Sequence, residues 1–299
     1  MKEILLNDAF FSRLETLDLN LRTNLIGYFG GKHLVKTYGQ TVEFADYREY
    51  ALGDDIRRID WNLYARFGRH YLKLFTDERQ MKIQIFLDCS ASMGKDNPQK
   101  ASYAVATAAA LGFLGVHNMD KVSFNFMREN KCDDPFGTII GKTPFFRAVN
   151  TLRTLEFDGD SDIEACVTGC QDVSSGNSLS IIISDFMTES NWKKAVDYLC
   201  YKNRQVLLIQ ILTPDEIDPA YEGRVSLIDS EALDMEDTKN MKINITPSMR
   251  LAYEEAMKDF VEDIRSFVVR RGGDYIKVRT DEPIEQVLFG GLFKVGIMS

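Results

Sequence analysis

The sequence predicts an α/β protein built on a doubly wound, mostly parallel β-sheet, with a smaller α+β subdomain before it. From residue 82 onward, short and almost wholly apolar runs alternate with amphipathic or alanine-rich stretches of helical length. Strands this apolar are typical of a parallel sheet that helices cover on both faces. The resulting order, β-α-β-α-α-β-α-β, indicates a doubly wound domain.

The expected elements follow one another closely along the chain. Strands are expected at 82–88, 120–127, 179–185, 204–212 and 274–280, and helices at 98–118, 143–155, 162–173, 191–200, 247–273 and 283–293. Residues 224–233 and 241–247 are expected to form short strands that interrupt the alternating pattern. Arg270, Arg271 and the glycine pair after them give the long helix a clear C-terminal end. We therefore divide the chain into 1–81, an N-terminal helix with a strand-rich subdomain, and 82–299, the α/β domain.

Composition excludes several classes of protein. The chain has 299 residues and a formal net charge of −9, which argues against a general nucleic-acid binder. No run approaches the roughly 20 apolar residues of a membrane helix, and the acidic N-terminal stretch reads as an amphipathic helix rather than a signal peptide. The five cysteines are scattered, as in a reduced cytosolic protein. We expect a cytoplasmic protein without membrane insertion.

Oxygen-bearing side chains gather where the predicted strands end. Asp88 ends the strand in FLDCSASMG, and Ser90 and Ser92 follow it at once. Asp185 ends LSIIISD in the same way, and Ser161 stands in the loop FDGDS before a helix. Ligands of open α/β sheets bind outside the carboxyl ends of the strands. Carboxylates and hydroxyls are the hard oxygen ligands that Mg²⁺ prefers, and these five leave at least one coordination position open.

This pattern resembles the metal-ion-dependent adhesion site of von Willebrand factor A domains, DxSxS…T…D. Ser161 stands here in place of threonine, and its neighbours Asp160 and Asp162 are alternative ligands. The resemblance implies Mg²⁺, with Mn²⁺ or Ca²⁺ as alternatives. The simpler interpretation is that Asp88 and Ser90 only cap the following helix.

A second informative segment, EFADYREYALGDDIRRIDWNLYAR, interleaves charged and aromatic residues. Its signature residues are Arg48, Tyr50, Gly53, Asp54, Asp55, Arg57, Asp60, Trp61 and Arg66. Gly53 favours a tight turn, and Asp60 is expected to cap a short helix from Trp61 to Arg66. The mixed signs favour internal ion pairs that fix the geometry of this segment, with docking of a partner as the alternative.

The run RxYxxGDDxRxIDWxxxAR, followed by a strand and DxSxSM, resembles the signature of the bacterial family called "domain of unknown function fifty-eight". LIDSEAL at 227–233 and RRGGDYIKVRTDEP at 270–283 are also similar to it, so the likeness covers nearly the whole chain. The resemblance implies a von Willebrand factor A-like domain in a cytoplasmic bacterial protein. It also implies a MoxR-type AAA+ ATPase, or a client of that ATPase, as the partner.

These features together predict a non-enzymatic interaction module whose metal binds an acidic side chain of a partner. One alternative is a metal-assisted, phosphatase-like hydrolase. It has little support, because the position two residues after Asp88 is Ser90 rather than a second acid. The histidines, His33, His70 and His117, fall in no predicted loop near Ser90. The other alternative is a scaffold with a degenerate metal site.

Overall fold

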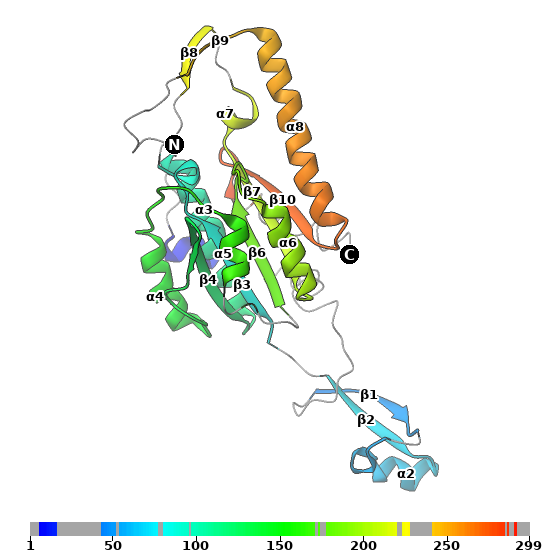
Figure 1. Cartoon of the computed structure of the whole chain (residues 1–299). Helices are drawn as coiled ribbons and strands as arrows, with labels where there is room; N and C mark the ends of the chain where they lie inside the picture. Colours follow the sequence, from blue (N-terminus) through cyan, green and yellow to red (C-terminus); the bar gives the residue numbers. More distant parts are fainter. Residues whose placement is uncertain are drawn as a thin grey trace.

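The computed structural model describes residues 6–16, 43–51, 54–76, 80–95, 97–170, 173, 178–219, 223–227, 241–284, 286 and 290–291. Its centre is a six-stranded sheet in the order β10-β7-β6-β3-β4-β5, in which only β5 runs antiparallel to its neighbour (Figure 1). The strands are β3 (Lys82–Asp88), β4 (Lys121–Arg128), β5 (Lys131–Asp133), β6 (Ser178–Ser184), β7 (Gln205–Leu212) and β10 (Asp274–Arg279). The predicted fold class, a doubly wound and mostly parallel sheet, is confirmed.

The winding of the sheet reverses at β3. The chain passes from β3 to β4 on one side, and then returns to pair β6 with the other side of β3. Lys82 is in register with Lys121 on one neighbour and with Ser178 on the other. The carboxyl ends of β3 and β6 therefore meet at the point where a doubly wound sheet opens its ligand crevice.

Helices cover both faces of the sheet, and each face has its own hydrophobic core. The helices are α3 (Pro98–His117), α4 (Lys142–Leu152), α5 (Ile163–Gly169), α6 (Trp192–Tyr201), α7 (Pro214–Ile217) and α8 (Pro247–Val269). The helices α3 and α4 pack on the face that presents Ile83 and Ile85. On the opposite face, α5, α6 and α8 pack against Phe86 and Ile182. This alternation of inward residues along β3 explains why its sequence is almost wholly apolar.

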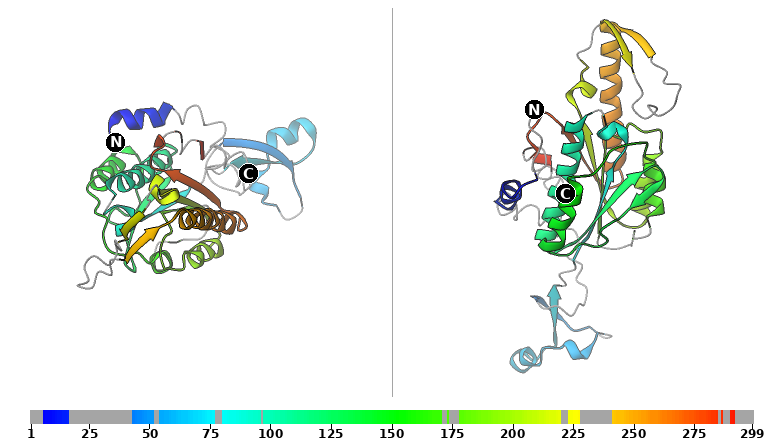
Figure 2. Two further views of the ribbon diagram at one scale, coloured as in Figure 1. Left: turned by 90° about the horizontal axis from the view of Figure 1, so that it is seen from above. Right: turned by 90° about the vertical axis from the view of Figure 1, so that its left-hand side faces the viewer.

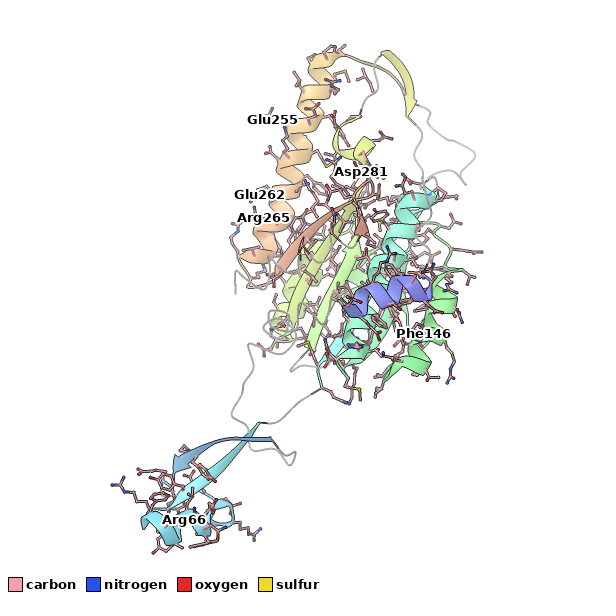
Figure 3. The ribbon with its side chains drawn as sticks, turned by 180° about the vertical axis from the view of Figure 1, so that it is seen from behind. Arg66, Phe146, Glu255, Glu262, Arg265 and Asp281 are labelled. Atoms are coloured by element: carbon pink, nitrogen blue, oxygen red, sulfur yellow. The ribbon has the colours of Figure 1, made fainter. Side chains whose placement is uncertain are left out.

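The helix over residues 8–16 packs on the α/β domain. Its Phe11 ring lies 5.1 Å from that of Phe113 on α3 and 5.3 Å from that of Phe146 on α4. Figure 3 shows Phe146 beside this helix. Phe10 and Leu14 are buried in the same core. The amphipathic character of the first stretch thus serves to bury one helix face.

The signature segment forms a small unit of its own, which stands apart from the sheet in Figures 1 and 2. Strand β1 (Glu43–Glu49) pairs antiparallel with β2 (Tyr71–Thr76), and η1 (Ile56–Arg58) and α2 (Trp61–Phe67) lie between them in the chain. The two short strands expected within 224–233 and 241–247 are present as an antiparallel pair, β8 (Gly223–Leu227) and β9 (Met241–Ile245). Residues 228–233 of that prediction, and most of the helix predicted at 283–293, lie outside the described residues.

Among the helices in the described parts of the chain, not one combines the length and the apolar content that crossing a bilayer requires.

Candidate metal centre

Three loops meet at the carboxyl edge of the sheet. The loop after β3 carries Ser90 and Ser92 around η2 (Ala91–Met93), and the loop before α5 carries Ser161. The third loop begins with Asp185, directly after β6. Backbone hydrogen bonds join the first two loops, from Ala91 N to Gly159 O at 2.8 Å and from Asp158 N to Cys89 O at 3.0 Å. The relative position of the two loops is therefore fixed by main-chain contacts.

Asp88 is the centre of this arrangement and is 1% exposed. Its Oδ1 accepts hydrogen bonds from Ser161 Oγ at 2.7 Å and from Ser90 N at 3.0 Å. Its Oδ2 accepts one from Ser184 Oγ at 2.6 Å. Burial and the nearby charge of Asp185 raise the pKa of Asp88, and the hydroxyl donors oppose that rise. A cation at this point would relieve the repulsion between the two carboxylates.

Two of the three serines are in contact with each other, and the third contacts Asp88. Ser90 Oγ is 3.1 Å from Ser92 Oγ, and Ser161 is fully buried against Asp88. The helix-cap interpretation of Asp88 and Ser90 is wrong for α3, because Asn97 caps that helix by accepting a hydrogen bond from Lys100 N. Ser90 sits at the N-cap position of η2 but makes no side-chain cap there.

The two acidic neighbours of Ser161 have other roles. Asp160 accepts a hydrogen bond from Ser161 N at 2.6 Å. Asp162 is the N-cap of α5 and accepts from Ala165 N at 3.0 Å. Of the three adjacent residues, Ser161 is the one whose side chain contacts Asp88.

Asp185 lies at the same edge but is held by different partners. Its Oδ1 accepts a hydrogen bond from Met187 N at 2.8 Å, and its Oδ2 accepts one from Lys100 Nζ at 2.7 Å. Lys100 also contacts Glu216 Oε1 at 2.7 Å. No hydrogen bond joins Asp185 to the three serines in the described part of the chain; the charge of Asp185 acts on Asp88 by raising its pKa.

Sequence reasoning missed Lys100, Ser184 and Glu216. Two of them left a signal, since Lys100 is a charge inside an alanine-rich helix and Ser184 directly precedes Asp185. Glu216 forms a capping box with Thr213. The sequence TPDE is typical of such a box, but it does not indicate a contact with Lys100.

The donors fit a hard divalent cation. The buried Asp88 accepts hydrogen bonds from two hydroxyls and one amide, which are donors that a metal can replace, and Ser90, Ser92 and Asp185 follow at the same edge of the sheet. No three His, Cys, Asp or Glu side chains within the described ranges are grouped to hold a metal. A divalent ion at this edge would therefore depend on the serine hydroxyls.

The signature unit is stabilised internally. Arg48 pairs with Asp54 at 2.8 Å, and this contact is the main cause of the lowered pKa of Asp54. Asp55 caps η1, and Asp60 caps α2 by accepting from Asn62 N and Leu63 N. The predicted cap of a helix starting at Trp61 is thus confirmed.

The remaining signature residues are less enclosed. Trp61 is 59% exposed, Arg57 and Arg66 are exposed, and Tyr50 is half-buried and donates its backbone N–H to His70 O at 2.9 Å. Arg66 is labelled in Figure 3 on this unit. Gly53 lies outside the described residues. The exposed Trp61 is consistent with docking of a partner, while the ion pair and the caps support the scaffold interpretation.

Comparison with known proteins gives a family but no characterised relative. Residues 46–262 match the family model described as "Protein of unknown function DUF58". An uncharacterized protein of Mycobacterium tuberculosis is 26% identical over 273 residues, which cover 90% of this chain and 84% of that protein.

Among solved structures, the hypothetical protein BatB from Bacteroides thetaiotaomicron gives a TM-score of 0.43 at 14% identity, with 73% of this chain and 99% of that chain covered. A von Willebrand factor type A protein from Catenulispora acidiphila gives a TM-score of 0.38 at 11% sequence identity. The match covers 76% of this chain and 43% of that chain. The fold assignment rests on the strand order above rather than on these values.

Proposed function

Because this chain belongs to the family described as protein of unknown function DUF58, and oxygen donors converge at its sheet edge, we propose that it is a metal-dependent protein-interaction module. The observation that supports this most directly is the contact of Asp88 with Ser161 and Ser184, at 2.7 and 2.6 Å, from two other segments of the chain. A buried carboxylate with hydroxyls around it offers the hard oxygen donors that Mg²⁺ prefers.

In this proposal, Asp88, Asp185 and the three serines hold Mg²⁺, or Mn²⁺ or Ca²⁺ in its place. The ion, when bound, supplies an open coordination position that attracts a carboxylate of the partner. The chain itself fixes the donors. The serines are held by loops that main-chain bonds join, and Ser184 on the strand orients Asp88.

The partner we propose is a MoxR-type AAA+ ATPase or its client, for which this chain would act as an adaptor or co-chaperone. The family resemblance supports that choice. The chemistry of the site adds one requirement, which is an exposed Asp or Glu on the partner surface that binds. The exposed aromatic side chains of the signature unit, with Trp61 59% exposed and Phe67 65% exposed, offer further contacts for a partner.

The hydrolase alternative has less support from the described residues. His70 stacks on Tyr64 in the signature unit, with ring centroids 4.4 Å apart, and His117 ends α3 at the opposite edge of the sheet from Asp88. His33 lies outside the described residues. Ser90 Oγ contacts another serine hydroxyl, which is not a base.

The proposal is tested by capture of the purified ATPase on this chain with Mg²⁺ or with chelator. Mg²⁺ is expected to be required, and Asp88→Asn is expected to lose both capture and the Mg²⁺-induced rise in Tm. Asp120→Asn is the matched control, because Asp120 is also buried but accepts its hydrogen bond from Met81 N at the amino end of β3. Undiminished capture in chelator would contradict the proposal.

A further inference from the structure

Lys100 is a fully buried cation beside the candidate metal centre. It lies in the first turn of α3, with its side chain 1% exposed. Its Nζ is 2.7 Å from Asp185 Oδ2 and 2.7 Å from Glu216 Oε1. One ammonium thus joins a proposed metal ligand at the end of β6 to an acid on α7.

Neither packing nor helix formation explains a charge at this position. Removing an ammonium from water is costly unless carboxylates pair with it, and the first turn of a helix disfavours a cation. The neighbouring helix positions are mostly alanine and other apolar residues, so an apolar side chain of similar length would fill the same space. The charge is therefore best explained by the acids that it faces.

Those acids include a residue that a divalent ion would also require. Asp185 and Asp88 are both buried, and the charge of Asp185 raises the pKa of Asp88. Lys100 supplies one positive charge to Asp185 of this pair. A divalent ion and an ammonium held against the same carboxylate repel each other strongly in a low-dielectric interior.

We propose that Lys100 is an internal competitor of the metal for Asp185, and that Glu216 receives the ammonium when the metal binds. This inference rests on the proposed metal-dependent function and specifies how that site is regulated. In the structure the ammonium is shared between two acids. Metal binding at Asp185 shifts the ammonium toward Glu216, whose side chain is 27% exposed.

Glu216 connects this exchange to a second region of the surface. Its other carboxylate oxygen accepts a hydrogen bond from Thr213 N at 2.7 Å, which closes the cap of α7. Its backbone oxygen accepts one from Tyr253 OH of α8 at 2.8 Å. Figures 1 and 2 show α7 and the first turns of α8 beyond the carboxyl ends of the strands.

The first turns of α8 also expose apolar side chains, with Met249 46% and Leu251 62% exposed. A stronger Lys100–Glu216 pair would hold α7, and through Tyr253 would hold these turns. Metal occupancy would thus change the surface beside the site that a partner approaches.

The test uses the full chain and Mn²⁺. Lys100→Met keeps the length of the side chain and removes its charge. Mn²⁺ affinity by titration calorimetry is expected to rise about tenfold or more. Backbone hydrogen exchange at 214–217 and 247–254 is expected to slow on Mn²⁺ addition in the wild type, and not in Lys100→Met. Lys193→Met is the matched control, since Lys193 pairs with Asp263 on the surface at 2.7 Å.

Glu216→Gln provides a second variant if Lys100→Met fails to fold. It leaves the ammonium on Asp185 alone, so Mn²⁺ binding is expected to weaken and the exchange response at α8 to disappear. Wild-type protein that binds no Mn²⁺ would contradict the proposed function itself. Mn²⁺ binding in the wild type with unchanged affinity and exchange response in both variants would overturn only the competition.

Discussion

Ser184 donates a hydrogen bond from its Oγ to Asp88 Oδ2 at 2.6 Å, across two neighbouring strands. The same Oγ accepts a hydrogen bond from Phe186 N at 2.9 Å, which fixes the direction of the hydroxyl proton. Ser184 is the last residue of β6 and is fully buried. The orientation of Asp88 is therefore set by the sheet itself, and not only by the loops that carry the other serines.

Ser184→Ala should weaken the site while leaving all five proposed ligands in place. The change removes a hydrogen bond to a buried charged group, so the free energy of unfolding should fall by about 1.5–3 kcal/mol. Loss of a residue that orients a metal ligand should lower Mn²⁺ affinity roughly 10–100-fold. Urea denaturation and titration calorimetry measure the two effects.

Ser123→Ala is the control for this prediction. Ser123 is also buried in the sheet, but its Oγ accepts only a neutral hydrogen bond from Asn125 Nδ2 at 3.3 Å in the described structure. A similar loss of Mn²⁺ affinity in both variants would mean that the Ser184–Asp88 contact has no special role.

Ser161→Ala and Asp160→Asn should separate two of the three adjacent candidates before α5. Ser161 Oγ is 2.7 Å from Asp88 Oδ1, so its removal deletes both a proposed ligand and a donor to Asp88. Mn²⁺ affinity should fall at least about tenfold. Asp160→Asn should leave the affinity nearly unchanged, because Asp160 accepts from the main chain at Ser161 N. Titration calorimetry measures the Mn²⁺ affinity of both variants. A larger loss of affinity in Asp160→Asn than in Ser161→Ala would make Asp160 the ligand.

The fold was predictable because its main elements are local and strongly patterned. Strands β3, β6 and β7 are buried on both faces and read as continuous apolar runs. Strand β5 was missed because Lys131, Cys132 and Asp133 show no apolar run. It exists through antiparallel pairing with the end of β4, which a local pattern does not encode.

Candidate site residues could be proposed from the sequence only where a residue type coincides with a strand end or stands in a loop before a helix. Asp88 and Asp185 were found in this way, and Ser161 through its loop. The contact of Lys100 with Glu216 joins residues 116 positions apart. Such a pair depends on the tertiary placement of α7 next to the first turn of α3, which the residues near Lys100 do not specify. Charges recruited by tertiary packing are therefore the part that local reasoning misses.

Gly112→Ala should destabilise the protein although alanine is the better helix former. A Cβ at this position of α3 would lie 2.6 Å from Phe124 Cζ and 3.2 Å from Phe145 Cε2, and aromatic rings cannot yield as a flexible chain end can. The overpacking should cost about 1–3 kcal/mol, which exceeds the gain of about 0.8–1 kcal/mol in helix propensity. Thermal unfolding measures the difference.

Gly169→Ala is the matched control, because nothing lies within 4 Å of a Cβ at that last residue of α5. It should leave stability unchanged or slightly higher. Equal losses in the two variants would show that the close approach of α3 to the sheet is not the cause.

Asp120 lies at the edge of the sheet opposite the candidate metal centre, and it should make the free energy of unfolding depend on pH. Burial raises the pKa of Asp120 to about 6, although its hydrogen bond from Met81 N opposes the rise. The folded protein therefore retains the proton at pH values where the unfolded chain has lost it. The stability contributed by this proton is complete below about pH 4 and is lost as the pH rises through 6.

Asp120→Asn should remove this dependence. The amide stays neutral at every pH and keeps an oxygen that accepts from Met81 N. At pH 7.5 the variant should exceed the wild type in free energy of unfolding by about 1–2 kcal/mol. At pH 4 the two proteins should be equally stable, since both then carry a neutral group. Urea denaturation of both proteins across this range measures the difference directly, and other titrating groups cancel because they are common to both. A gap that stays constant with pH would show that the substitution acts through packing rather than through the proton on Asp120.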